Sequence, residues 1–371
     1  MTETLSALNA LNFSGGPGVL PDEVLRQAQA ALIAAPGQDL SVLGISHRSK
    51  WFLEVIEEVE HNIRTLLHLP ADYHVLLLQG GATQQFSMIP MNWLKGTQLS
   101  ADYLHTGYWS GKALPEAQRE GKVRVIWRGE CADFKRLPND NELDFDPDAA
   151  YFHYVSNETV EGLQFHRLLG RDDVPRVCDM SSDFLSKPID VNRFSLIYAH
   201  AQKNLGPAGV TVVLLHKNFL ERASNDLPGF LDYRKHIAAH SIYNTPPVFA
   251  IYVVMLVTRW LLNTIGGLKN MAAINEEKAR CLYQVLDDNA DFYQGRSLET
   301  DRSLMNVVFN LPDEMLEKQF LSESLGAGFS GLSGHRAIGG IRASIYNAMP
   351  LSSVKALADF MRDFQRRRDK R

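Results

Sequence analysis

Runs of apolar residues alternate along the chain with stretches in which apolar and polar residues recur with a helical period. Residues 50–67 carry apolar side chains every three or four positions, which predicts a helix with one apolar face. A second helix is predicted over residues 22–35. Six mostly apolar runs predict strands covered on both faces: residues 74–78, 123–127, 151–155, 176–178, 196–199 and 210–215. This alternation is typical of an α/β protein with a mainly parallel sheet.

The pattern changes after residue 265, where Gly266 and Gly267 interrupt it. The elements predicted beyond this break are a long charged helix over 268–288, strands over 305–311 and 341–345, a helix near 313–325 and a closing helix over 352–367. We therefore predict a large α/β domain over residues 16–265 and a smaller α+β domain over residues 266–371. Residues 1–15 are expected to pack on the smaller domain.

Composition excludes several classes of protein. The chain has 371 residues, of which 45% are hydrophobic and 22% charged, so it is neither disordered nor collagen-like. Its net charge of −5 gives no general reason to bind nucleic acid or an anionic membrane, and we expect neither partner. Any affinity for anions must come from a local cluster of positive groups.

The chain has three cysteines that lie far apart, Cys131, Cys178 and Cys281. Because no CxxC pair occurs, we expect neither a metal site nor a disulfide framework, and a reduced cytoplasmic setting fits best. Neither uncharged stretch that is long enough to test predicts a membrane span: residues 75–94 are too polar, and residues 241–258 predict a buried helix with two prolines in its first turn. No signal peptide is expected at the N-terminus.

Lys203 lies in the most informative segment. An apolar strand leads into a turn that contains Lys203, Gly206, Pro207 and Gly209, and a second apolar strand follows. Desolvation at a rigid strand end lowers the pKa of a lysine amine, and such an amine can form a Schiff base with a carbonyl cofactor. The alternative is a surface lysine on a hairpin.

Asp179 ends the predicted strand over residues 176–178, at the edge of the sheet where α/β folds gather ligands. An aspartate there can accept a hydrogen bond from a protonated pyridine nitrogen and keep the ring cationic. Helix capping and magnesium binding are the alternatives at this position.

A strand, a small-residue turn and a helix follow one another from residue 74 to residue 86. The backbone N–H groups of Gly81, Ala82 and Thr83 are expected at the N-terminus of this helix, where amides and the helix dipole favour a phosphate. The segment has neither a Walker lysine nor a GxGxxG pattern, so it predicts neither an ATP loop nor a dinucleotide site. A plain strand-to-helix turn remains the alternative.

Other residues offer stacking and anion binding. Trp109 follows a glycine near a strand end and can stack on a flat cofactor or belong to the core, and Thr159 can donate to a ring oxygen or belong to a turn. Positive groups stand at His47, Arg48, His335, Arg336 and Arg342. Guanidinium groups suit carboxylate and phosphate oxygens, although structural ion pairing is commoner for a single arginine.

Taken together, these motifs resemble the phosphoserine aminotransferases, a class-V family of pyridoxal-phosphate enzymes with the aspartate-aminotransferase-like fold. The resemblance runs from about residue 12 to the C-terminal helix. Its most specific motifs are AQKNLGPAG at residues 201–209 and RASIYNAMP at residues 342–350. Two positions depart from the family: Thr83 stands where some members have arginine, and Gly15 stands where serine or alanine is common.

The resemblance implies pyridoxal 5′-phosphate held as an aldimine on Lys203, with Asp179 at the pyridine nitrogen. It implies that Trp109 stacks on the ring and that Thr159 binds the phenolic oxygen. The residues that it assigns to the cofactor phosphate are Ala82, Thr83 and Gln202, joined by Asn244 and Thr245 from the neighbouring subunit of a homodimer with shared active sites.

The same resemblance implies a transaminase that exchanges the amino group between L-glutamate and O-phospho-L-serine, or 4-phosphohydroxy-L-threonine of vitamin B6 synthesis. Substrate anions are assigned to His47, Arg48, His335, Arg336 and Arg342, with Arg342 on the α-carboxylate. Two rival interpretations are a cysteine desulfurase with the same cofactor and a non-catalytic anion-binding module. The first needs a mobile reactive cysteine, whereas Cys178 lies within an apolar strand.

Overall fold

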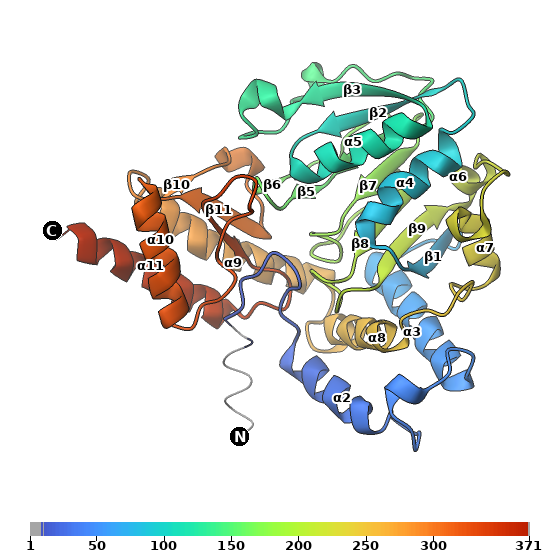
Figure 1. Ribbon diagram of the computed structural model, residues 1–371, viewed down its shortest axis with the longest axis horizontal. Coiled ribbons are helices and arrows are strands. Elements are labelled where there is room, and N and C mark those ends of the chain that lie inside the picture. The colour runs from blue at the N-terminus through green and yellow to red at the C-terminus, as the bar shows by residue number, and fades with distance from the viewer. Residues whose placement is uncertain (1–8, 10, 370–371) are drawn as a thin grey trace.

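The computed structural model describes residue 9 and residues 11–369, so part of the segment 1–15, which is predicted to pack on the smaller domain, lies outside the described residues. Figure 1 shows a larger part built on a central sheet beside a smaller part drawn in orange and red. The central sheet has seven strands in the order β1-β9-β8-β7-β4-β2-β3. They are β1 (Tyr73–Leu78), β9 (Thr211–His216), β8 (Leu196–His200), β7 (Arg176–Asp179), β4 (Phe152–Val155), β2 (Ser100–His105) and β3 (Lys122–Arg128).

This sheet is mainly parallel. Neighbouring strands from β8 to β3 run parallel, whereas β9 is antiparallel to both β1 and β8. The six predicted strands are confirmed to within one residue at each end. The apolar pattern does not predict β2, because polar residues interrupt it. One of them, Asp102, is buried because its carboxylate accepts the N–H of Asp146 and pairs with Arg124.

Alternate strand residues enter two different cores, as the period of two requires. On β1, Val75 and Leu77 belong to one core, and Leu76 and Leu78 belong to the other. The helices of the first core are α2 (Asp22–Ile33), α3 (Lys50–Leu67) and α8 (Val248–Asn263). Those of the second are α4 (Gly81–Trp93), α5 (Tyr108–Glu120), α6 (Lys217–Glu221) and α7 (Tyr233–Ala238). The sheet is therefore covered on both faces.

The buried helix predicted over residues 241–258 corresponds to α8, but its predicted start is wrong. α8 begins at Val248, so Pro246 and Pro247 precede the helix instead of occupying its first turn. A proline disfavours the helical conformation of the residue before it, so Pro247 keeps Pro246 out of the helix. No single described helix meets the length and hydropathy of a membrane span, and α8 and α9 (Leu268–Asp287) do so only as a pair bent by 91°.

The smaller part combines an antiparallel sheet with long helices. Its elements are β10 (Gln294–Gly295), β11 (Asn306–Asn310), β12 (Ile341–Ser344), α9, α10 (Glu314–Gly326) and α11 (Leu351–Asp369). Phe13 is buried in the core of this part, and its N–H donates to the carbonyl of Ser330. A two-stranded ribbon, β5 (Asn157–Glu158) and β6 (Leu163–Gln164), follows β4. The division at residue 266 stays a prediction, because α9 contributes side chains to the cores of both parts.

Candidate active site

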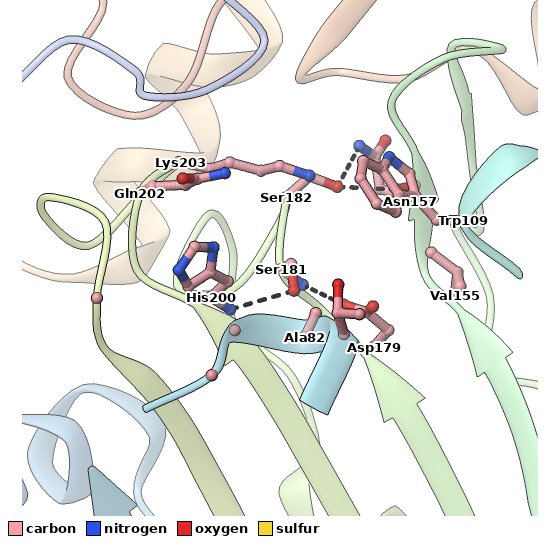
Figure 2. A pocket seen from close by; sticks show the side chains of 14 residues that line it. Ala82, Trp109, Val155, Asn157, Asp179, Ser181, Ser182, His200, Gln202 and Lys203 are labelled. Carbon is pink, nitrogen blue, oxygen red and sulfur yellow. Dashed lines mark hydrogen bonds between the residues drawn. The ribbon is translucent and has the colours of Figure 1, made fainter. Parts of the chain in front are cut away.

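A cavity of about 420 Å³ opens at the carboxyl ends of β4, β7 and β8, beside the first turn of α4 (Figure 2). Ligands of open α/β sheets bind at this edge, because the strand ends and the helix N-termini meet there. The predicted site residues that line it are Ala82, Thr83, Trp109, Asp179, Gln202 and Lys203. These six come from four segments separated in the sequence by tens of residues, and the fold brings them together.

Lys203 lies on the turn between β8 and β9. The N–H of Ala201 donates to Val210, and the N–H groups of Leu205 and Gly206 donate to Ala201, which makes the turn rigid. The amine Nζ lies 5.5 Å from the centroid of the Trp109 ring. Desolvation lowers the pKa of this amine to about 8, although the nearby carboxylate of Asp179 opposes the shift. An appreciable fraction of the amine is therefore unprotonated and nucleophilic near neutral pH.

Asp179 is buried at the end of β7 and faces the same cavity (Figure 2). Its Oδ1 accepts the N–H of Ser181 at 2.8 Å. Burial raises the pKa of the carboxyl, while the hydrogen bonds from Ser181 and the positive charge of Lys203 lower it. A buried carboxylate with few partners is suited to a cationic N–H donor of a bound ring.

The first turn of α4 forms one wall of the cavity. Gly80 and Gly81 both have positive φ, 87° and 68°, which glycine adopts at no steric cost. α4 has no side-chain cap at its N-terminus. The amides of Ala82 and Thr83 are among those that find no partner inside the helix, so they suit an anion such as a phosphate. Gln202 lies across the cavity from this turn (Figure 2).

Trp109 forms the facing wall, and its position is fixed from two sides. The indole Nε1 donates to Thr159 Oγ1 at 2.9 Å. The buried carboxylate of Glu158 accepts the backbone N–H groups of Trp109 and Ser110 at 3.1 and 3.0 Å, which anchors the start of α5. Thr159 itself is not one of the lining residues, so its contact with a cofactor oxygen stays a prediction.

Arg342 reaches the site from β12 of the smaller part. Its Nη1 lies 3.4 Å from the carbonyl of Thr159, and its charge helps to lower the pKa of Lys203. A Cβ atom at Gly15 would lie 2.3 Å from Nη2, so the guanidinium occupies the space that a side chain at this position would need. The buried Nε has no partner among the described residues. Arg342 therefore has hydrogen-bonding capacity left for an anion.

Besides Thr159 and Arg342, which lie next to the cavity without lining it, six predicted residues do not line the cavity of a single chain: His47, Arg48, Asn244, Thr245, His335 and Arg336. Arg48 is exposed just before α3. The carbonyl of Thr245, before α8, accepts a hydrogen bond from Gln79 Nε2 at 2.8 Å. His335 contacts the ring of Tyr108, with 4.5 Å between the ring centroids. The structure thus separates these residues from those at the strand ends.

Four lining residues were missed by sequence reasoning: Asn157, Ser181, Ser182 and His200. Asn157 Nδ2 donates to Ser182 Oγ at 2.7 Å, so this pair is part of one buried network. The available signal was position, because all four follow or end a predicted strand at the carboxyl edge of the sheet. Small polar residues are common in turns, however, and their type alone does not indicate a site.

Comparison with known proteins identifies the family. The class-V aminotransferase family model matches residues 10–357. The chain belongs to the class-V aminotransferase family. It is 49% identical to a phosphoserine aminotransferase of Chromobacterium violaceum, in an alignment that covers 96% of this chain and 98% of the relative.

Solved structures agree with this assignment and confirm the predicted fold class. A phosphoserine aminotransferase from Bacillus circulans subsp. alkalophilus superimposes with a TM-score of 0.93 at 44% identity, covering 96% of this chain and 98% of the other. A phosphoserine aminotransferase from Trichomonas vaginalis, described as bound to pyridoxal phosphate, gives 0.90 at 37% identity over 95% and 99% of the two chains.

Proposed function

We propose that the protein is a pyridoxal-phosphate-dependent transaminase that exchanges the amino group between L-glutamate and O-phospho-L-serine. The observation that carries this proposal is the position of the Lys203 amine, which lies over the ring of Trp109 and within the electrostatic influence of Asp179 in one cavity. The phosphoserine aminotransferases that cover nearly the whole chain support the choice of substrate.

The residues of the cavity fit pyridoxal 5′-phosphate. The first turn of α4, with Ala82 and Thr83, would hold the phosphate together with Gln202. Trp109 would stack on the ring, Asp179 would accept the ring N–H, and Lys203 would bind the aldehyde carbon covalently. When bound, the cofactor carries the amino group and accepts electron density from the reacting carbon. Keeping a buried carboxylate at the ring nitrogen favours the cationic ring.

Lys203 also moves the proton. When not bound covalently, its amine would be a base within the cavity. A pKa lowered to about 8 allows the amine both to accept the α-proton of the amino acid and to return it, as general acid–base catalysis near neutral pH requires.

Arg342 would bind the α-carboxylate, because its buried Nε lacks a partner and its guanidinium lies beside Lys203. Glutamate and phosphoserine both carry a second anion, for which Arg336 offers a positive charge and His335 a hydrogen-bond donor, since desolvation and the charges of Arg342 and Arg336 lower the pKa of His335. A phosphorylated threonine derivative of vitamin B6 synthesis has the same pattern of charges and is a second candidate substrate.

We propose further that the enzyme is a homodimer in which a second copy supplies His47, Arg48, Asn244 and Thr245. Two observations support this arrangement: these residues lie outside the cavity of their own chain, and large apolar side chains near them in the sequence are exposed. The exposed apolar side chains are Leu40, Leu43, Leu53 and Tyr243. Such exposure is typical of a surface that another chain covers.

Mixing two inactive variants tests the shared site. K203A removes the amine from one chain, and R48A removes the arginine proposed to act across the interface. Random reassembly of a two-fold dimer leaves about one site in four with both residues intact, so the mixture should recover up to about a quarter of wild-type activity. Recovery of nothing, with heterodimers shown to form, would place Arg48 in its own chain's site or outside both.

The desulfurase alternative has little support. Burial raises the pKa of the Cys178 thiol well above its ordinary value, and none of the three cysteines lines the cavity. All three are free thiols, which is consistent with the proposed cytoplasmic location.

Steady-state assays decide the substrate. Purified, dialysed protein is expected to be yellow, to lose its visible band with borohydride, and to prefer phosphoserine over aspartate as amino donor when 2-oxoglutarate is the acceptor. Phosphohydroxythreonine, assayed in competition, measures the share of the vitamin B6 reaction. Colourless protein that pyridoxal phosphate cannot reconstitute would refute the proposal and favour the anion-binding module.

A further inference from the structure

His200 is a cavity residue without an assigned role. It ends β8, three residues before Lys203, and Figure 2 shows its ring inside the cavity between the first turn of α4 and Gln202. Three ring atoms lie 3.8 to 3.9 Å from the place where a Cβ atom of Gly81 would be. The imidazole therefore packs directly on the first residue of α4, next to the unpaired amides.

The backbone of His200 is fixed, whereas its ring is unengaged. Its N–H donates to Ser181 Oγ at 3.1 Å, and Ser181 in turn is bound to Asp179. Neither ring nitrogen has a hydrogen-bond partner within the described part of the chain. Desolvation, together with the charge of Lys203, lowers the pKa of the imidazole to about 4, so the ring is neutral in the open cavity. A neutral imidazole offers one N–H donor.

The phosphate end of the cavity has few charged side chains. Among the described residues that line the cavity, Lys203 is the sole lysine or arginine. The amine of Lys203 is committed to the cofactor aldehyde. A phosphate at the N-terminus of α4 is thus stabilised by amides, by Gln202 and by the helix dipole, and His200 is a further side chain beside this turn that can donate.

We propose that His200 is a further ligand of the cofactor, and that its imidazole N–H donates to a phosphate oxygen held at the first turn of α4. This inference rests on the proposed function, since it concerns the same cofactor. The ring of His200 packs on Gly81 at the first turn of α4, so the phosphate group and not the ring of the cofactor is what His200 recognises.

Comparing the binding of pyridoxal 5′-phosphate and pyridoxal shows whether His200 recognises the phosphate or the ring of the cofactor. The apo-protein, in its native assembly, is titrated with pyridoxal 5′-phosphate and with pyridoxal, which has the same ring and aldehyde but no phosphate. For H200A we expect the affinity for pyridoxal phosphate to fall about tenfold or more, the size of a lost hydrogen bond to a charged group. The affinity for pyridoxal should stay within about twofold of wild type. H200Q, which keeps an N–H donor, should recover part of the loss.

H61A provides a matched control, because His61 is exposed on α3 and does not line the cavity. It should leave both affinities unchanged. A second readout is the ³¹P resonance of the bound cofactor, which should move in H200A and stay in place in H61A. This measurement remains informative if a variant binds too weakly for accurate titration.

Two results would overturn the inference. Equal losses for both ligands would mean that His200 only shapes the cavity wall, and no loss for either would mean that the ring does not reach the cofactor. Both results differ from a failure of the proposed function, in which the wild-type protein itself would not bind pyridoxal phosphate.

Discussion

The residues at the strand ends and those around the mouth of the site are held in different ways. Asp179, Gln202 and Lys203 lie on β7 and on the turn after β8, which hydrogen bonds and two cores hold in place. A second set, which we call the rim, lies on irregular segments before α3, before α8 and before β12. The rim residues are His47, Arg48, Asn244, Thr245, His335 and Arg336. A single chain therefore forms the cavity, but its own rim residues do not line it.

This difference indicates a division of labour. Strand ends of a packed sheet cannot move independently, so they suit a group that must be held at fixed angles. Loop residues can close on substrates of different size, and they can also act in a neighbouring subunit. The cavity is expected to determine the chemistry and the rim to determine which amino acid enters. Each prediction below alters one region and asks whether the other follows.

Replacing Lys203 by alanine should have the largest effect. Loss of both the covalent link and the acid–base group is expected to reduce kcat by a factor of roughly 10⁴ or more and to remove the visible band that the link to Lys203 gives the cofactor. Reconstituted K203A should still bind pyridoxal phosphate, because the phosphate wall and Trp109 are untouched. Full transaminase activity in K203A would show that the cavity residues do not determine the chemistry.

Replacing Asp179 by asparagine should have the next largest effect. The amide has nearly the same shape but no charge, so the ring nitrogen loses the partner that keeps it cationic. We expect kcat to fall by roughly 10²- to 10³-fold, as for other losses of preorganised electrostatic stabilisation. The KM for glutamate should change little, because Asp179 does not face the substrate. A change in KM without a change in kcat would show that a cavity residue affects substrate binding, and that cavity and rim do not have separate roles.

Replacing Arg342 by lysine tests the contact between the two regions. Lysine keeps the charge but loses the bidentate geometry, so kcat/KM for both amino donors should fall by roughly 10- to 100-fold. The spectrum of the bound cofactor should remain that of the wild type. R222K, at an exposed position on the turn after α6, should be neutral and serves as the control.

Most of the central sheet could be predicted from the sequence, because most of its strands are short apolar runs of neighbouring residues. The apolar runs predict six of the seven central strands. They do not predict β2, because it contains Asp102, which is buried with partners far along the chain. Lys203 and Asp179 follow such runs directly, so their side chains could be placed at one edge. His200 also follows such a run directly, but its role could not be assigned from position alone, because that role depends on the contact with Gly81.

Lys278 connects the two parts of the molecule. It is fully buried on α9, and its Nζ donates to the carbonyls of Ile345 and Tyr346 at 3.0 and 2.7 Å, just after the strand that carries Arg342. The backbone N–H of the next residue, Asn347, donates to Oδ1 of Asn204, the neighbour of Lys203 in the chain. Lys278 thus stabilises the segment that spans from rim to cavity.

The pH dependence of stability gives the smallest and last expected effect. Desolvation lowers the pKa of Lys278 to about 7, below the ordinary value of the unfolded chain. The unfolded state therefore binds the extra proton between these two pKa values, and folding stability rises with pH across that window. Relative to K278M, which cannot titrate, the wild-type free energy of unfolding should increase by roughly 1–2 kcal/mol between about pH 7 and pH 9. Denaturant unfolding of both proteins at each pH measures this difference directly. If the difference in the free energy of unfolding between wild type and K278M stays constant with pH, Lys278 keeps its proton in the folded state, held by the carbonyls. If this difference occurs only in the apo-protein, the bound cofactor stabilises the contact between the two regions in place of Lys278.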